Sequence, residues 1–161
     1  MPWANVPGTV GRPIPGVKVK IVDLETLQDV TNKQTGEIWV SGPNVMKGYH
    51  NQPGETAKAL TTDGWLRTGD MGEMTPEGHI RITGRLREMI KVAGEMVFPA
   101  EVENALLAFP AVLEAGVAGA KDERKGEIVK AYVVLKPDQT ATEDQILQHC
   151  RSTLAAYKVP K

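Results

Sequence analysis

Apolar and polar residues alternate in two stretches near the start of the chain. The first runs from Val17 to Asp23 and the second from Glu37 to Ser41, and a period of two is typical of a strand with one buried face. Turn residues that include Thr31 and Asn32 separate the two stretches. Prolines and glycines interrupt residues 1–16, which predicts a loop over the surface.

The remainder of the first half continues in short elements. A proline followed by good helix formers predicts a helix over Pro53–Leu60. Residues 71–74 and 79–83 predict two more strands, joined by a tight turn at residues 75–78. So many strands in about 80 residues indicate a small sheet or a distorted barrel.

The second half changes to a pattern in which helices and strands alternate. Apolar residues recur at helical spacing over Glu101–Phe109, between two prolines. Valine-rich strands are predicted over residues 112–117 and 127–135, and residues 121–126 join them. A small hairpin is expected around Gly94.

A capping box marks the start of the last predicted helix. Either Thr142 with Gln145 or Thr140 with Glu143 fits this motif. The whole set of elements defines an α+β fold: a small, mostly β subdomain with the form of a distorted barrel, then an α+β domain in which helices flank a short sheet.

Residues 84–103 separate the two halves and predict a mobile joint. The segment carries paired basic residues, a carboxylate and Gly94, so a ligand could be gripped there by motion of the two parts. The resulting division is a β-rich subdomain at residues 1–83, a hinge at 84–91 and a second domain at 92–161.

Composition and charge narrow the classes of partner. The chain has 161 residues, of which 41% are hydrophobic, and its formal net charge of −1 provides no global field that would recruit nucleic acid or an anionic membrane. The single cysteine, Cys150, excludes an internal disulfide and fits a reducing compartment. With no apolar run of about 20 residues and no signal-peptide core, a cytoplasmic protein is expected.

Asp70 and Arg85 are the first candidates for binding chemistry. Asp70 lies in a glycine-flanked turn, where a carboxylate can accept two hydrogen bonds from a vicinal diol such as that of ribose. Arg85 ends the strand that returns from this turn, so both side chains could converge on one nucleotide. A carboxylate that bonds its own turn, and a surface salt bridge for Arg85, remain alternatives.

The joint contributes Glu88, Lys91 and Gly94. A glycine in a strand marks a special backbone angle or close approach by another group, and a plain hairpin turn at Gly94 is the alternative. The basic run Lys121–Lys125 fits a phosphate contact or a solvated connection. The three histidines lack metal-ligand spacing, so no metal site is indicated.

Five motifs in a fixed order resemble one known family. The chain is similar to the carboxyl-terminal third of the adenylate-forming (AMP-binding) superfamily, and acyl-CoA synthetases and fatty-acid CoA ligases are the members it resembles most. The motifs are Gly8-x-Val10-Gly11-Arg12-Pro13-x-Pro15-Gly16, Gly36-Glu37-Ile38-Trp39-Val40 with Gly48-Tyr49, Trp65-x-x-Thr68-Gly69-Asp70, Gly84-Arg85-x-x-Glu88-x-Ile90-Lys91-x-x-Gly94-Glu95 and Pro99-x-Glu101-Val102-Glu103.

The resemblance implies a two-step reaction. Such enzymes join a carboxylic acid to Mg-ATP, giving an acyl-adenylate and pyrophosphate, and then transfer the acyl group to a thiol, commonly that of CoA. The implied partners are an acyl-chain carboxylic acid, ATP or AMP, and CoA. The resemblance assigns Asp70 to the ribose hydroxyls, Arg85 to the ribose and phosphate, Glu88 to the hinge position where aspartate is usual, Lys91 to catalysis by the rotating lid, and Gly94 to the pantetheine tunnel.

The resemblance also implies that parts of the active site lie outside this chain. The family's phosphate-binding loop, acyl pocket and magnesium-binding residues are expected before Met1, and its Gly-Lys motif after Lys161. We therefore expect a fragment that is inactive alone, with the rest of the amino-terminal domain as its partner and a tendency to dimerise or swap domains. An adenylation domain that loads a carrier protein, and a non-catalytic interaction module, remain alternatives.

Overall fold

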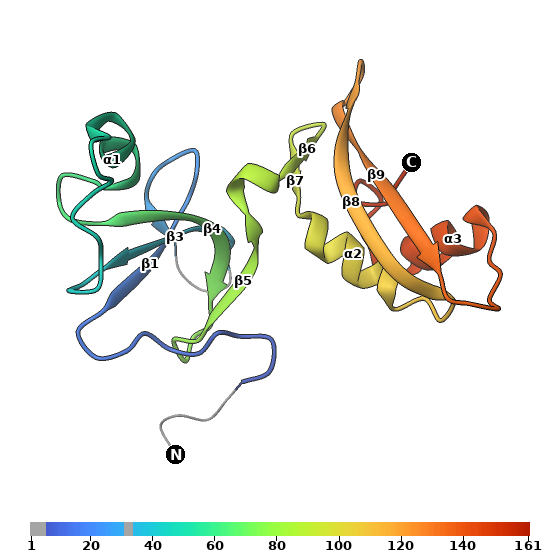
Figure 1. Cartoon of the computed structure of the whole chain (residues 1–161), viewed down its shortest axis with the longest axis horizontal. Helices are drawn as coiled ribbons and strands as arrows, with labels where there is room; N and C mark the ends of the chain where they lie inside the picture. Colours follow the sequence, from blue (N-terminus) through green and yellow to red (C-terminus); the bar gives the residue numbers. More distant parts are fainter. Residues whose placement is uncertain (1–5, 31–33) are drawn as a thin grey trace. The chain divides into compact units, whose positions relative to one another are not determined.

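The computed structural model divides into two compact units, Met1–Leu86 and Arg87–Lys161 (Figure 1). It describes residues 6–30 and 34–161, so the first five residues of the predicted loop and the predicted turn at Thr31 and Asn32 lie outside the described ranges. Within those ranges, no helix combines the length and the apolar character that a bilayer crossing requires.

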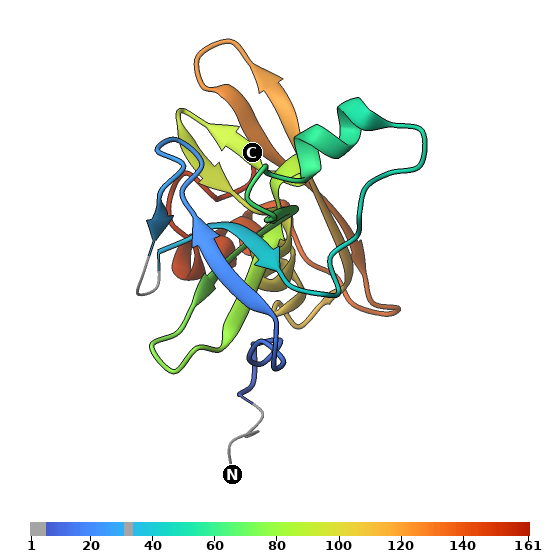
Figure 2. The same ribbon diagram turned by 90° about the vertical axis from the view of Figure 1, so that its left-hand side faces the viewer.

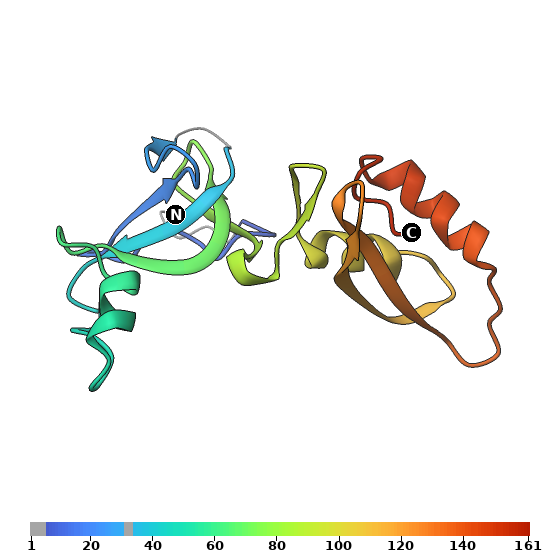
Figure 3. The ribbon, with the colours of Figure 1, turned by 90° about the horizontal axis from the view of Figure 1, so that it is seen from above.

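The first unit contains one antiparallel sheet of five strands in the order β2-β1-β3-β4-β5. Its predicted strands and helix are confirmed, and in Figure 3 the helix α1 projects away from the sheet. The elements are β1 (Lys18–Val22), β2 (Asp29–Val30), β3 (Gly36–Ser41), α1 (Pro53–Ala59), β4 (Leu66–Met74) and β5 (Ile80–Arg85).

The sheet of the first unit is open, so the prediction of a barrel is wrong: the sheet does not close on itself. One described edge is β2, and its two residues offer too few backbone groups to close the sheet. The other edge, β5, bonds instead to the amino-terminal loop. The Val10 N–H donates to the Ile80 carbonyl at 2.8 Å, and the Ile80 N–H donates to the Gly11 carbonyl at 2.9 Å.

Strand β4 departs most from its prediction. A strand is expected only from residue 71, with Asp70 in a turn, but Asp70 lies inside one strand that runs from Leu66 to Met74. Arg67 pairs with Trp39 and Met71 pairs with Glu37, so four steps along β4 match two along β3. The extra residues form a bulge, and β4 (green) bends visibly in Figure 3.

The second unit contains a four-stranded antiparallel sheet in the order β7-β6-β9-β8 and two helices. The predicted helices, strands and hairpin around Gly94 are confirmed. Strand β8 is longer than predicted, and Figure 2 shows the β8–β9 hairpin (orange) with its short turn. The elements are β6 (Ile90–Val92), β7 (Glu95–Val97), α2 (Pro99–Leu107), β8 (Val112–Asp122), β9 (Gly126–Leu135) and α3 (Glu143–Thr153).

Each unit has its own apolar core. Ile21, Ile38 and Ile80 form the buried cluster of the first unit. In the second unit both helices contribute to one cluster with β6, β7 and β9, because alternate residues of these strands point toward the helices. Its buried members are Ile90, Val92, Val97, Val102, Leu106, Val129 and Cys150.

Helix α3 begins with the Thr142 capping box, which decides between the two predicted motifs. The Gln145 N–H donates to Thr142 Oγ1 at 3.3 Å, and the Thr142 N–H donates to Gln145 Oε1 at 2.9 Å. Thr142→Ala is expected to lower the free energy of unfolding by about 1 kcal/mol, since a helix N–H loses its acceptor. Urea titration measures this, and Thr140→Ala, which removes an exposed threonine outside the box, should change little. Equal losses in both variants would contradict the assignment.

Candidate functional site

Asp70 and Arg85 face each other across β4 and β5. They are register partners in the ladder, and Arg85 Nε lies 3.5 Å from Asp70 Oδ1. The side chains are 35% and 56% exposed. One carboxylate oxygen and the outer nitrogens of the guanidinium therefore remain available to hydroxyl or phosphate groups. The structure shows the salt bridge foreseen as an alternative, in a geometry that also leaves room for a ligand.

The bulge in β4 fixes the backbone that carries Asp70. Gly69 has a φ of +72°, a left-handed conformation that favours glycine. The Thr68 hydroxyl donates to the Ile38 carbonyl at 2.7 Å and accepts from the Asp70 N–H at 3.0 Å. These bonds replace part of the β3–β4 ladder that the bulge interrupts.

Glu37 is a buried carboxylate that sequence reasoning missed as part of this site. Glu37 is 8% exposed. Its Oε1 accepts from the Gly69 N–H at 3.1 Å, and its Oε2 accepts from Trp39 Nε1 at 2.7 Å. The sequence signal for this role was a glutamate within a run of apolar residues, because a carboxylate in a buried strand needs hydrogen-bond donors around it.

Thr83 is the unmatched residue of a second bulge, between β4 and β5. Its hydroxyl is buried and has no hydrogen-bond partner among the described residues.

Lys91 and Gly94 lie together in the second unit, beside the turn between β8 and β9. They line one depression with Lys121 and Lys125. Lys91 points outward between two buried neighbours, and its N–H donates to Glu127 Oε2 at 2.8 Å. Gly94 has a φ of +93° in the β6–β7 turn, and this backbone angle accounts for the glycine. The geometry is that of a plain hairpin turn, which was the predicted alternative.

The β8–β9 turn organises its own charges through Asp122. The N–H groups of Lys125 and Arg124 donate to Asp122 Oδ1 at 2.8 and 3.0 Å, and these bonds hold the pKa of the carboxyl below its usual value. Lys121 and Lys125 form no ion pair within the described ranges. The basic run is thus a structured turn in which Lys121 is exposed and Lys125 is half-buried.

Glu88 ends a short 3-10 turn, Leu86–Glu88, that follows β5. Its carboxylate is half exposed, and Oε1 lies 3.5 Å from Arg87 Nε. The turn coincides with the division between the two compact units after Leu86. Glu88 and Arg87 also line a depression of the second unit with Pro99 and Glu103.

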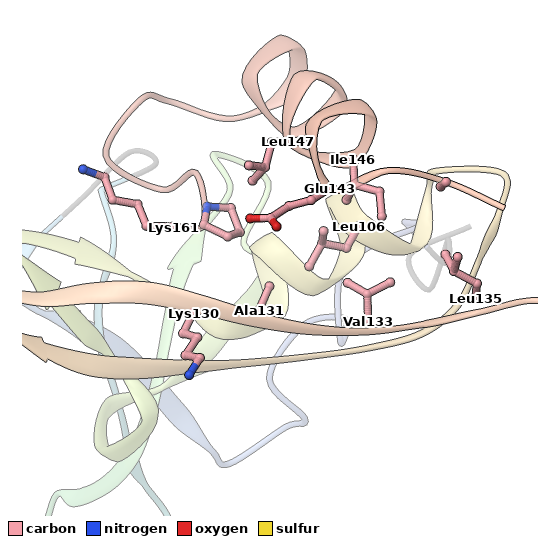
Figure 4. Close-up of a pocket in the computed structure, with 11 residues that line it drawn as sticks. Leu106, Lys130, Ala131, Val133, Leu135, Glu143, Ile146, Leu147 and Lys161 are labelled. Carbon is pink, nitrogen blue, oxygen red and sulfur yellow. The ribbon is translucent and has the colours of Figure 1, made fainter.

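A cavity of about 430 Å³ in the second unit is lined by none of the predicted site residues (Figure 4). Leu106 of α2, Val133 of β9 and Ile146 of α3 line it. Three charged residues, Lys130, Glu143 and Lys161, also line it. Over residues 6–30 and 34–161, no three His, Cys, Asp or Glu side chains converge as a metal site would require.

Models of two protein families match the sequence. "AMP-binding enzyme" matches residues 1–50, and "AMP-binding enzyme C-terminal domain" matches residues 101–161. A long-chain-fatty-acid–CoA ligase of Bacillus subtilis is 46% identical over 157 residues, which is 98% of this chain and 28% of the ligase. The chain thus spans less than a third of the length of such relatives.

Solved structures of two proteins share this fold over nearly the whole chain. ATP-bound MatB from Rhodopseudomonas palustris has a TM-score of 0.91 at 38% identity, covering 97% of this chain and 31% of MatB. The apo form of MatB has a TM-score of only 0.71. The o-succinylbenzoate CoA synthetase MenE of Bacillus subtilis, in complex with its acyl-adenylate intermediate, has a TM-score of 0.86 at 38% identity, covering 95% of this chain and 31% of MenE.

Proposed function

Because this chain belongs to the AMP-binding enzyme family, we propose that it is the carboxyl-terminal portion of an acyl-CoA synthetase. The reaction joins a carboxylic acid to ATP as an acyl-adenylate, releases pyrophosphate, and then forms a thioester with CoA and frees AMP. The names of similar proteins support this class, since they include a long-chain-fatty-acid–CoA ligase and a CoA synthetase captured with an acyl-adenylate. An acyl-chain carboxylic acid is therefore the proposed substrate.

The Asp70–Arg85 pair carries the proposal. Asp70 would accept hydrogen bonds from the two ribose hydroxyls, because a carboxylate has acceptors for both and the bulge presents it at a fixed angle. Arg85 would contact the ribose and the phosphate with its planar donors. A pair at this separation, half exposed on adjacent strands, suits a nucleotide better than either residue alone.

The segment around Glu88 is proposed as the hinge between a β-rich subdomain at residues 1–83 and a lid at 92–161. Two structures of MatB support mobility in the matched region of that protein, since its ATP-bound and apo forms superpose very differently on the same chain. Rotation about residues 84–91 would exchange the arrangement for adenylation with that for thioester formation.

Lys91 and Gly94 are proposed for the thioester step. Lys91 has an exposed ammonium group on a strand whose neighbours are buried, so a catalytic contact would cost no rearrangement of the core. The β6–β7 turn at Gly94 has open space at its surface, as an approaching pantetheine arm requires. The rest of the amino-terminal domain would supply the acyl pocket and the residues that hold Mg²⁺. A cytoplasmic location is proposed from the single reduced cysteine.

Nucleotide binding to the chain tests this proposal. Asp70→Ala is expected to raise the Kd for AMP about tenfold, because a hydrogen bond to a charged group is lost. A titration followed by NMR detects such weak binding. Glu73→Ala is the matched control, since Glu73 lies in the same strand and pairs with Arg81 on β5 at 3.0 Å. Equal weakening by both variants, or no AMP binding by the unchanged chain, would contradict the proposed site.

A further inference from the structure

We infer that Glu37 is a positioning residue that sets the orientation of Asp70 for the nucleotide. The inference rests on the proposed function for its ligand, but its geometry stands on the bulge in β4. Glu37 lies on β3, one strand away from Asp70, and it makes contact with the loop of the bulge rather than with the proposed ligand.

The bulge leaves backbone groups of β4 without ladder partners. Between the pairs Glu37–Met71 and Trp39–Arg67, three residues of β4 face the single residue Ile38 of β3. Asp70 is paired with Arg85 of β5, but Thr68 and Gly69 have no ladder partner, so the backbone groups of these two residues need other partners. The Gly69 N–H is one such group, and Glu37 Oε1 accepts from it at 3.1 Å.

Glu37 is suited to this task because it is held on both sides. Its second oxygen accepts from Trp39 Nε1 at 2.7 Å, and the residue is 8% exposed. Trp39 is itself 7% exposed. Lys20 Nζ and Arg67 Cζ lie 5.0 and 4.9 Å from the centre of its ring. A carboxylate fixed in this way has little rotational freedom, so the Gly69 amide has a fixed direction as well.

The direction of the Gly69 amide decides where Asp70 points. The Gly69 N–H, before the Cα of Gly69, donates to Glu37, and the Asp70 N–H, after it, donates to the Thr68 hydroxyl. Both backbone N–H groups next to the Asp70 side chain are therefore anchored to β3, one directly and one through Thr68. Without Glu37, Gly69 could leave its φ of +72° at little cost, because glycine has many accessible conformations.

Glu37→Gln tests the inference. Glutamine offers one acceptor and places an amide donor against the other N–H group, so the Gly69 contact or the Trp39 contact is lost. We expect hydrogen exchange at the Gly69 amide to become about tenfold faster or more, and the Kd for AMP to rise about tenfold. Both are measured by NMR on the same sample.

A matched control separates positioning from general damage. Glu73→Gln neutralises a glutamate of β4 that contacts Arg81 instead of the bulge, and it should not change Gly69 exchange by more than about twofold. Trp39→Phe keeps the ring and removes the indole donor that holds the second Glu37 oxygen, so it should speed Gly69 exchange by less than Glu37→Gln does. Glu37→Asp is the second test variant, because its shorter carboxylate cannot reach both donors, and it should behave like Glu37→Gln.

The outcomes distinguish this inference from the proposed function. Unchanged Gly69 exchange and AMP affinity in Glu37→Gln would overturn the positioning role and leave nucleotide binding intact. Failure of the unchanged chain to bind AMP would count against the proposed function, and the Gly69 exchange rates would still decide whether Glu37 holds the bulge. Unfolding of both Glu37 variants, with a folded Glu73→Gln control, would also overturn it, because Glu37 would then maintain the sheet as a whole.

Discussion

Replacing Leu106 with alanine is expected to lower the free energy of unfolding of the second unit by about 3 kcal/mol. Leu106 is 1% exposed and belongs to the buried cluster that joins α2 to β9 and α3. Truncation removes apolar contacts with these elements and leaves a space that a packed core fills only in part. Guanidinium titration, followed by the far-ultraviolet signal, measures the loss.

The neighbouring residue provides the control for Leu106. Leu107 follows it on α2 but is 45% exposed, so Leu107→Ala should change the stability by no more than about 0.5 kcal/mol. Cys150, buried in the same cluster as Leu106, supplies an independent reporter. The thiol is fully buried, and burial also raises its pKa, so labelling requires the cluster to open. Leu106→Ala should speed the labelling and Leu107→Ala should not; equal rates would contradict the packing assigned to α2.

Helix and strand patterns predicted most of the second unit because its elements are regular. The β9 residues Val129, Ala131 and Val133 alternate toward the helices without interruption, so a simple period of two identified the strand. The choice between Thr142 and Thr140 as the helix cap could not be made from sequence. Both motifs have the required residue types and spacing, and only the position of the first helical turn selects between them.

Strand β4 escaped prediction because a bulge breaks the period on which prediction depends. Extra residues between Arg67 and Met71 shift the alternation, so a strand was predicted only from Met71, with Asp70 in a glycine-flanked turn before it. The open sheet, where a barrel was expected, has a different cause. Closure of a sheet depends on the lengths and register of its edge strands, and the two-residue length of β2 has no clear signal in composition.

The proximity of Asp70 and Arg85 follows from the predicted hairpin, since residues that flank a tight turn at similar distances meet across the ladder. The hydrogen bond by which Glu37 supports the bulge does not follow from the predicted hairpin. A glutamate beside apolar neighbours in an alternating strand is expected to face water, and only the bulge of the adjacent strand brings N–H donors to its buried carboxylate. The proposed ligand contacts were thus more predictable than the proposed positioning residue.

A side chain at Gly72 is expected to disturb both the stability of the first sheet and the geometry of its candidate site. Gly72 lies two residues after Asp70, and its partner in β5 is Ile82 at the second register shift. A Cβ built on Gly72 would overlap the carbonyl oxygen of Arg81 and lie 2.8 Å from the Ile38 side chain. The first contact is with backbone, so no change of rotamer relieves it and β4 must move away from β5.

Gly72→Ala is therefore expected to cost about 3 kcal/mol of stability in the first unit and to separate Asp70 from Arg85. Gly54→Ala is the control, because a Cβ on Gly54 meets nothing within 4 Å and alanine favours the α1 helix in which it lies. Urea titration gives the stability, and nuclear Overhauser contacts between β4 and β5 report the separation. In the folded fraction of Gly72→Ala, AMP should bind at least as weakly as it does to Asp70→Ala, because misdirection of the carboxylate displaces Arg85 as well. Wild-type affinity in a variant with a widened β4–β5 pair would show that the two side chains act independently on the nucleotide.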